Sequence, residues 1–252
     1  MKTILTFAAA LALSAPALAG EAVSYEAAGT SFDAYWEAPV GARGTVVILP
    51  TWNGLSDYEM DRAKMLAEAG YNALAVDLYG GSARPQSPED KEAALNAVFA
   101  DGDRLRAILA ATVGKAESLA GGGNVVMLGY SMGGGAAMEL VRSGLGAELG
   151  VDGYAVFSGR VSDPGGRMIP DGTAPIFVAH GTEDGRVPVS GLVNFADDLD
   201  LAGVEHRIEI YEGAGHLFSA FGFPNYDPEL DAASWEALGA FLESLTEAGG
   251  AS

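Results

Sequence analysis

The sequence predicts an α/β fold built on one mostly parallel sheet with helices on both faces. Short apolar segments alternate with longer segments of helical periodicity along the 252 residues. This order is typical of parallel sheets with right-handed crossovers. The apolar segments are hydrophobic at nearly every position, as expected of strands that are buried on both faces. In such sheets, functional residues lie in the loops beyond the carboxyl ends of the strands.

The elements follow in order after a polar lead-in. Strands are expected at residues 44–50, 71–78, 124–130, 153–157, 175–179 and 207–211. Helices are expected at 58–69, at 88–120 with a break near Asp101 and Gly102, from Met132 onward, at 189–202 and at 232–247. Gly70 is the expected end of the first helix. No repeat or linker divides this order, so we expect one domain over residues 20–252.

Residues 1–19 have the pattern of a signal peptide. Lys2 precedes a short apolar segment at 4–13, and Ala17-Leu18-Ala19 supplies the small residues of a cleavage site before Gly20. The apolar segment is too short to span a bilayer. A retained anchor or a buried helix is the alternative. We expect an exported protein, periplasmic or secreted, with no membrane association after cleavage.

Composition restricts the functions that the chain can have. The 14 Lys and Arg against 34 Asp and Glu give a formal net charge of −20, which argues against nucleic acid and anionic lipid as partners. Zero cysteines exclude disulfides and thiol chemistry, and three scattered histidines do not favour a zinc site. We therefore expect neither a metal nor a cofactor. We also expect a monomer, although composition leaves the oligomeric state open.

Gly129-Tyr130-Ser131-Met132-Gly133 fits the pattern G-x-S-x-G where a predicted strand meets a predicted helix. A nucleophile elbow requires this context, because its tight turn leaves no room for side chains around the serine. The helix would also place the Met132 N–H and the positive end of the helix dipole beside a developing oxyanion. Alternatively, Ser131 simply caps the helix.

A serine hydroxyl needs a base to take its proton, and this base is usually a histidine. His216 lies in a glycine-rich loop after the last predicted strand, at the same edge of the sheet as Ser131. His206 begins that strand and therefore lies at the opposite edge. His180 ends the preceding strand, where local packing or hydrogen bonding is expected. His216 is therefore the candidate general base.

The third residue of such a site is a carboxylate that orients the imidazole. Glu183 and Asp184 both follow the predicted strand at 175–179. Asp184 is the better candidate, because Gly185 allows a tight turn that aims a short side chain inward, whereas Glu183 is expected to be exposed. Serine, aspartate and histidine then follow in the chain order of α/β hydrolases.

The loop after the first buried strand is expected to complete the oxyanion hole. In Thr51-Trp52-Asn53-Gly54, the Trp52 N–H would point toward the serine, and Gly54 would ease the turn. Alternatively, Trp52 only covers the core. Thr51 and Asn53, together with Tyr130, are further candidates for substrate binding.

Two further features bound the pocket. Arg84 and Arg160 are candidates for binding an anionic group, although a surface ion pair is the favoured alternative for each. The connection between Ser158 and Pro175 is too short for a helical cap. An open site of this kind suits small, soluble esters or lactones.

Four stretches of the sequence resemble the dienelactone hydrolase family. They are "GLSDYEMDRAKMLAEAGYNALAVDLYGG", "GYSMGG", "HGTEDGRVP" and "GAGHLF", and the similarity covers essentially all of the chain after residue 19. By this resemblance, Ser131, Asp184 and His216 fall on the catalytic triad of the family, and Met132 and Trp52 fall on its oxyanion-hole amides. The resemblance implies an α/β-hydrolase fold with a minimal cap and the activity of a carboxylic ester hydrolase.

Three positions depart from the family pattern. Members that act on dienelactone use a cysteine nucleophile, which is Ser131 here, and carry a glutamate where this chain has Thr51. The two changes are consistent, because the family's glutamate takes part in activating the cysteine thiol, and a serine–histidine pair does not need this activation. The arginine that follows the family's histidine is also missing, since this chain reads His216-Leu-Phe-Ser-Ala220. These departures argue against hydrolysis of dienelactone itself.

The sequence therefore predicts a serine hydrolase that cleaves small carboxylic esters or lactones through an acyl-enzyme. A peptidase or amidase with the same three residues is the alternative within the same class. A non-catalytic binding protein on the hydrolase scaffold is the alternative from another class, although such proteins usually lack one of the three residues.

Overall fold

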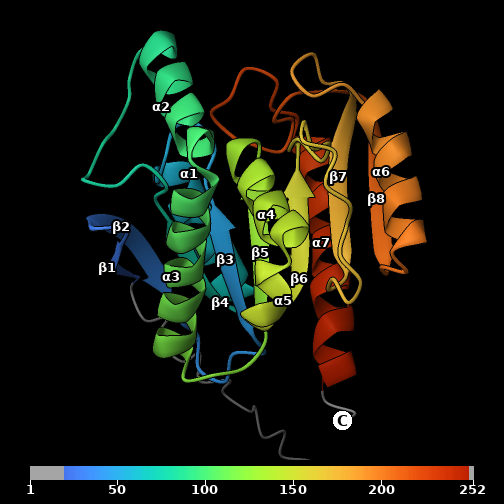
Figure 1. The fold of residues 1–252 in the computed structure, drawn as a ribbon. Helices are drawn as coiled ribbons and strands as arrows, with labels where there is room; N and C mark the ends of the chain where they lie inside the picture. Colours follow the sequence, from blue (N-terminus) through green and yellow to red (C-terminus); the bar gives the residue numbers. More distant parts are fainter. Residues whose placement is uncertain (1–19, 250–252) are drawn as a thin grey trace, which may run out of the picture.

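The computed structural model describes residues 20–249, which form one eight-stranded sheet in the order β1-β2-β4-β3-β5-β6-β7-β8 with helices on both sides (Figure 1). The predicted signal peptide, residues 1–19, lies outside the described residues. The strands are β1 (Glu21–Ala27), β2 (Thr30–Glu37), β3 (Thr45–Leu49), β4 (Asn72–Val76), β5 (Val125–Tyr130), β6 (Val151–Phe157), β7 (Ile176–Glu183) and β8 (His206–Gly215). Strands β3 to β8 pair in parallel, which confirms the predicted fold class.

The hairpin of β1 and β2 replaces the predicted polar lead-in and joins the sheet along β4, antiparallel to it. Its turn consists of Ala28 and Gly29, whose φ angles of 47° and 73° match the right-handed twist of the strands. Every second side chain of β2 is buried, namely Phe32, Ala34 and Trp36. This alternation across a few charged residues is a weaker signal than the continuous apolar runs of the central strands.

The helices connect the strands largely as predicted. They are α1 (Asp57–Glu68), α2 (Pro88–Ala100), α3 (Gly102–Ala120), α4 (Met132–Ser143), the short α5 (Leu145–Glu148), α6 (Ser190–Leu201) and α7 (Pro228–Gly249). The predicted break in the second helical segment lies at Asp101, which ends α2 and accepts the Arg104 N–H as the N-cap of α3. Among residues 20–249, none of these helices is long and apolar enough to cross a membrane.

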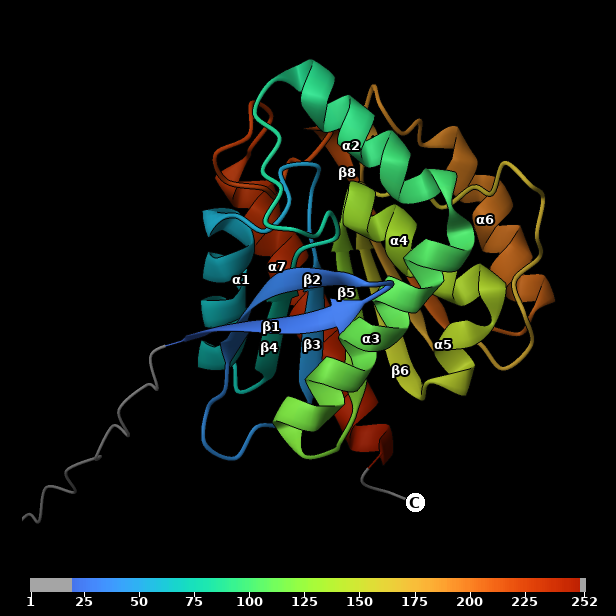
Figure 2. The ribbon, with the colours of Figure 1, turned by 60° about the vertical axis from the view of Figure 1, so that its left-hand side comes forward.

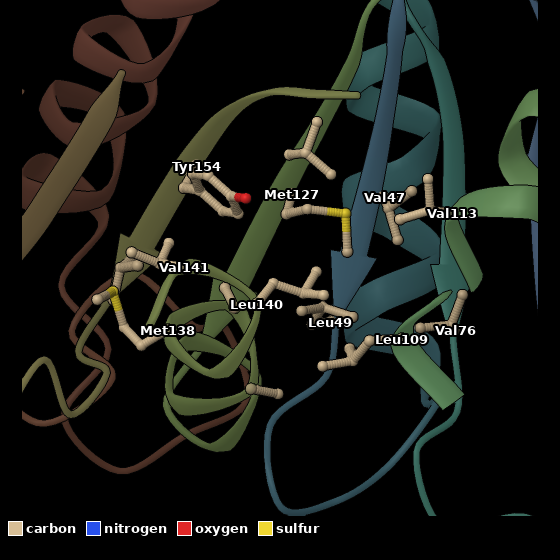
Figure 3. Close-up of a cluster of buried hydrophobic side chains, with 14 of the residues drawn as sticks. Val47, Leu49, Val76, Leu109, Val113, Met127, Met138, Leu140, Val141 and Tyr154 are labelled. Atoms are coloured by element: carbon tan, nitrogen blue, oxygen red, sulfur yellow. The ribbon is translucent and has the colours of Figure 1, made fainter. Parts of the chain in front are cut away.

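Two hydrophobic cores lie on opposite faces of the sheet. Val47 and Leu49 of β3 belong to the core under α3, α4 and α6, whereas Val46 and Ile48 belong to the core under α1 and α7. Figure 2 shows α1 and α7 on one side of the strands and α3 and α4 on the other. Figure 3 shows the first core, in which β3 to β6 face α3 and α4. Each large apolar side chain that is fully buried stabilises the fold by about 1.5–3 kcal/mol.

The loops after β3, β5, β6, β7 and β8 share one edge of the sheet, because these strands are parallel. Residues 158–175, between β6 and β7, contain no helix, so this connection adds no helical cap. The cores thus hold five strand ends in fixed positions and leave their loops accessible.

Candidate active site

Ser131 occupies a strained turn between β5 and α4. Its φ of 52° and ψ of −104° are rare for a residue with a side chain. The flanking glycines leave no room for larger residues. A Cβ on Gly129 would lie 2.3 Å from the Gly133 carbonyl oxygen, and one on Gly133 would lie 2.2 Å from the Leu49 carbonyl oxygen. The strand, the serine and the helix can therefore meet only where both neighbours are glycine.

The Ser131 hydroxyl does not cap the helix that it precedes. It makes no capping hydrogen bond to α4. Its Oγ lies 2.9 Å from Nε2 of His216, at hydrogen-bond distance. The structure therefore shows the serine facing a histidine instead of the alternative role as an N-cap.

Asp184 holds the other nitrogen of the His216 ring. Its Oδ2 lies 2.8 Å from His216 Nδ1, and its Oδ1 accepts the backbone N–H groups of Arg186 at 2.9 Å and Val187 at 2.8 Å. Burial raises the pKa of Asp184, but the hydrogen bond from His216 and the two N–H donors outweigh it and hold the pKa below its ordinary value. The ionised carboxylate accepts a hydrogen bond from Nδ1–H, and this tautomer leaves the lone pair of Nε2 directed at Ser131.

Strands β7 and β8 bring these two residues together. Both strands extend four residues past their predicted ends, and Glu183 pairs with Gly215 at the far end of the ladder. Asp184 and His216 each follow directly. The Glu183 side chain is exposed while Asp184 is buried, as the sequence predicts.

The other two histidines have local partners. Nε2 of His180 lies 2.7 Å from the Val187 carbonyl oxygen, and the side chain is fully buried beneath the loop of Asp184. His206 lies at the start of β8, where Nδ1 is 2.9 Å from the Val204 carbonyl oxygen. Both placements agree with the sequence analysis.

The loop of His216 is held by side chains from distant segments. The Leu217 N–H donates to Oγ of Ser158 at 3.1 Å, and Nδ2 of Asn225 donates to the His216 carbonyl oxygen at 3.1 Å. Farther along, the Ser219 carbonyl oxygen accepts from Arg62, a buried arginine that also forms an ion pair with Asp231 of α7. These partners lie far apart in the chain, so sequence patterns do not reveal them.

The turn after β3 leaves two backbone donors, the N–H groups of Trp52 and Leu55, without an acceptor among residues 20–249. The Asn53 N–H donates to Oγ1 of Thr51 at 3.3 Å, and the Gly54 N–H donates to the Thr51 carbonyl oxygen at 3.0 Å. Among residues 20–249, the Trp52 N–H has no acceptor. Tyr79 Oη donates to the carbonyl oxygen of Trp52 at 2.7 Å. This bond holds the backbone at Trp52 and leaves the Trp52 N–H available.

A second donor lies at the start of α4. The N–H groups on either side of Met132 are occupied, because Ser131 donates to Phe157 and Gly133 donates to Pro50, both at 2.8 Å. The Met132 N–H has no acceptor within the part of the chain that the structure describes. Both predicted oxyanion residues therefore have an unused N–H.

A cavity of about 400 Å³ opens over Ser131 and His216. Its wall is mainly apolar and aromatic, and it consists of Trp52, Leu95, Phe99, Ser131, Met132, Gly135, Arg160, Arg186, Val187, His216, Leu217, Phe223, Pro224 and Asn225. The Arg186 guanidinium stacks 4.6 Å from the ring of Trp52, and that of Arg160 lies 5.9 Å from the ring of Phe99. Arg160 was predicted from the sequence, whereas Arg186 and Phe99 were not, because they reach the cavity from segments remote from Ser131.

The remaining predicted binding residues lie outside the lining of this cavity. Thr51 is fully buried inside its turn, and Asn53 is half-buried and does not line the cavity. Tyr130 is also fully buried, because alternation along β5 turns it into the core of α1 and α7. Arg84 forms an ion pair with Asp33 at 3.0 Å, which is the alternative favoured from the sequence. Among residues 20–249, no group of three or more histidine, aspartate or glutamate side chains is placed to hold a metal ion.

Comparisons with known proteins agree with this geometry. Residues 32–246 match the sequence model of the dienelactone hydrolase family. A Saccharolobus solfataricus protein assigned as a carboxymethylenebutenolidase is 24% identical, over 89% of this chain and 98% of its own. A Bradyrhizobium protein assigned as a 2-oxo-3-(5-oxofuran-2-ylidene)propanoate lactonase is 25% identical, over 82% of this chain and 87% of its own.

Solved structures have the same fold. A dienelactone hydrolase-like promiscuous phosphotriesterase from metagenomic libraries superposes with a TM-score of 0.79 at 24% identity, and covers 91% of this chain and 99% of its own. Thermogutta terrifontis esterase 2 superposes with a TM-score of 0.67 at 20% identity, and covers 90% of this chain and 94% of its own. With the family match over most of its length, the chain belongs to the dienelactone hydrolase family of carboxylic ester hydrolases.

Proposed function

We propose that the protein cleaves small carboxylic esters or lactones through an acyl-enzyme formed on Ser131. The observation that carries this proposal is the continuous series of hydrogen bonds from Asp184 through His216 to Ser131, which ends in an open cavity. Serine, histidine and aspartate in this geometry form the machinery of acyl transfer on several unrelated folds.

The reaction follows from the positions of the atoms. Ser131 Oγ attacks the carbonyl carbon while Nε2 of His216 takes its proton, and the N–H groups of Met132 and Trp52 stabilise the oxyanion. His216 then gives the proton to the leaving oxygen, which departs as an alcohol, or stays attached in a lactone. Finally, His216 takes a proton from water, the hydroxide attacks the acyl ester, and Ser131 recovers its proton as the acid is released.

A fluorophosphonate probe and short p-nitrophenyl esters test this proposal. Wild-type protein should be labelled at Ser131 and should hydrolyse the esters, and Ser131→Ala should abolish both. Retained esterase activity in Ser131→Ala would show that another residue is the nucleophile. Folded wild-type protein that resists labelling would favour the non-catalytic scaffold. A panel of esters, lactones and peptides separates esterase from peptidase, because a peptidase would cleave the peptides as well, whereas an esterase would leave them intact.

Two arginines further narrow the proposed substrates to esters or lactones that carry a carboxylate. Arg160 and Arg186 line the cavity, and neither forms an ion pair among residues 20–249, although the chain has 34 acidic residues. The names of the two relatives above also denote lactones with a carboxylate group. An arginine can bind a carboxylate with two parallel hydrogen bonds.

Matched substrates test this preference. Arg160→Gln and Arg186→Gln should each raise KM about tenfold for a carboxylate-bearing ester and leave KM for the neutral ester of equal length unchanged. Arg207→Gln is the control, since this arginine pairs with Glu209 on β8 and lies outside the cavity. Equal changes for both esters would show that the arginines only shape the wall.

We also propose that the protein is exported after removal of residues 1–19. The cleavage pattern before Gly20 supports this proposal. N-terminal sequencing of the protein from the culture medium and the periplasmic fraction should begin at Gly20. Full-length protein that remains in the cytoplasmic fraction would contradict it.

A further inference from the structure

Glu59 is a buried carboxylate whose two oxygens have different partners. It is the third residue of α1, and its side chain is fully buried. Oε2 accepts the Ser56 N–H at 3.0 Å and the Ser56 hydroxyl at 2.5 Å. Oε1 accepts the Thr51 N–H at 3.1 Å and the Thr51 hydroxyl at 3.3 Å. One side chain therefore joins both ends of the segment 51–56.

Helix capping accounts for only one of these oxygens. In a capping box, the third helical residue reaches back to the N-cap, which is what Oε2 does with Ser56. The bonds of Oε1 reach Thr51, eight residues before Glu59 and outside the helix. Burial raises the pKa of Glu59 even though the groups of Ser56 and Thr51 donate to it and oppose the rise.

Thr51 is the residue on which the turn after β3 depends. Its carbonyl and hydroxyl oxygens accept the N–H groups of Gly54 and Asn53, and its own N–H donates to Glu59. Among residues 20–249, the N–H groups of Trp52 and Leu55 are the donors of this turn that have no acceptor, and of these two residues Trp52 lines the cavity. The Trp52 N–H belongs to the peptide bond between Thr51 and Trp52. The bonds that fix Thr51 therefore also fix the position of the Trp52 N–H.

We infer that Glu59 is a positioning residue for the oxyanion hole, in which Oε1 fixes Thr51 and thereby aims the Trp52 N–H, while Oε2 separately caps α1. This inference rests on the proposed function, because it assigns the turn a role in stabilising the oxyanion. Glu59 does not touch the substrate and acts only through the turn. Loss of one oxyanion donor costs about 10²–10³ in kcat in a serine protease, which sets the upper limit of the effect.

Two variants separate the two oxygens. Glu59→Met keeps the volume and helix propensity but removes all four bonds, whereas Ser56→Ala removes the hydroxyl at Oε2 and keeps the bonds of Oε1 to Thr51. We expect Glu59→Met to lower kcat about 30-fold, within that limit, with KM changed less than about twofold. Ser56→Ala should lower Tm through the weaker cap and leave kcat within about twofold of wild type.

The rate of labelling by a fluorophosphonate gives a second readout, because its P=O oxygen occupies the oxyanion site. The labelling rate of Glu59→Met should fall in proportion to kcat. If wild type is labelled and Glu59→Met reacts at the same rate, the inference is wrong and the proposed function stands. If folded wild type is not labelled at all, both are wrong. If kcat falls in proportion to Tm in both Glu59→Met and Ser56→Ala, Glu59 only stabilises the fold and has no separate role in the oxyanion hole.

A shorter side chain covers the case in which Glu59→Met does not fold. Glu59→Asp remains a good residue near a helix N-terminus, but it is one methylene too short to bond Thr51 and Ser56 together. It should show the same fall in kcat below the melting transition, together with a lower Tm, because the shorter buried carboxylate leaves donors without an acceptor. Normal kcat in a folded Glu59→Asp protein would overturn the inference.

Discussion

The two halves of the candidate site are held in place by different kinds of contact. Ser131 is fixed by its own backbone, since a positive φ angle and two glycines without room for a Cβ define the turn. His216 and Asp184 are fixed by side chains, among them Ser158 and Asn225, together with backbone N–H groups of their loops. The first half is therefore set by main-chain geometry around one short motif, which packs against the ends of β3 and β6. The second half depends mainly on side chains that the fold brings together.

This difference predicts how each half fails. An added atom in the elbow has nowhere to go, because the obstacles are main-chain atoms that cannot rotate away. A deleted hydrogen bond around the histidine leaves the loop in place but less well aligned. Substitutions in the elbow should therefore act on folding and activity together, whereas those around His216 should act mainly on activity.

Gly133→Ala should have the largest effect. Its Cβ would lie 2.2 Å from the Leu49 carbonyl oxygen, so β3 and α4 must separate. We expect loss of measurable esterase activity and a fall of about 3 kcal/mol in the free energy of unfolding, measured in urea. Gly114→Ala is the control, because the added Cβ on α3 meets no atom within 4 Å and should stabilise the helix by about 0.5–1 kcal/mol. Normal activity in Gly133→Ala would show that the backbone around Ser131 can shift to accommodate a Cβ at this position.

Asp184→Asn should abolish most activity without unfolding the protein. The amide oxygen can still accept the N–H groups of Arg186 and Val187, so the loop stays in place. The amide NH₂ then faces Nδ1 of His216 and forces the proton onto Nε2, where it cannot accept from Ser131. We expect kcat to fall about 10⁴-fold, as for the equivalent change in a serine protease. Glu183→Gln changes the exposed neighbouring acid and should leave kcat unaltered.

The pKa of Asp184 gives this comparison a pH dependence. The folded-state pKa lies below the ordinary aspartate value, so ionised Asp184 stabilises the folded protein above the unfolded-state pKa. This contribution is lost as pH falls through the folded-state pKa. The difference in unfolding free energy between wild type and Asp184→Asn should therefore be constant near neutral pH and shrink in acid. A difference that grows in acid would contradict the assigned direction.

These contrasts explain which parts of the site could be predicted from the sequence. Ser131 is recognisable because the elbow is local, and Asp184 and His216 because each follows a strand of a parallel sheet. The wall of the cavity is not recognisable, because Phe99 of α2 and Phe223 near α7 approach it only in the folded chain. The interpretation of Tyr130 as a binding residue ignored the side-chain alternation along β5.

Packing also explains the elements that the sequence left open. The hairpin of β1 and β2 is stabilised where Phe32 and Trp36 reach the core under α3. The ion pair of Arg62 with Asp231 joins residues 169 positions apart, and only the fold shows that it supports the loop after His216. Such pairs carry no local pattern, whereas glycines around a serine do.

His180→Leu should have an intermediate effect. The variant leaves the Val187 carbonyl oxygen without its buried partner, in the same peptide segment whose N–H holds Asp184. We expect kcat to fall about tenfold and the free energy of unfolding to fall by about 1–3 kcal/mol. His206→Leu is the matched control, because His206 lies at the opposite edge of the sheet and should leave kcat unchanged. Equal losses in the two variants would exclude a specific role for His180.

Arg84→Ala should have the smallest effect. Arg84 lies outside the cavity and pairs with the partly exposed Asp33 at 3.0 Å, so its ion pair is worth about 0–1 kcal/mol and weakens with salt. Burial raises the pKa of Asp77, and the charge of Arg84, 3.8 Å away, lowers it again. Without Arg84, the ionised form of Asp77 loses this stabilisation, so the variant should be slightly less stable at neutral pH. KM for a carboxylate-bearing ester should stay within about twofold of wild type, in contrast to Arg186→Gln. A tenfold rise in that KM alone would mean that substrates reach Arg84, and that the binding surface extends beyond the cavity over Ser131.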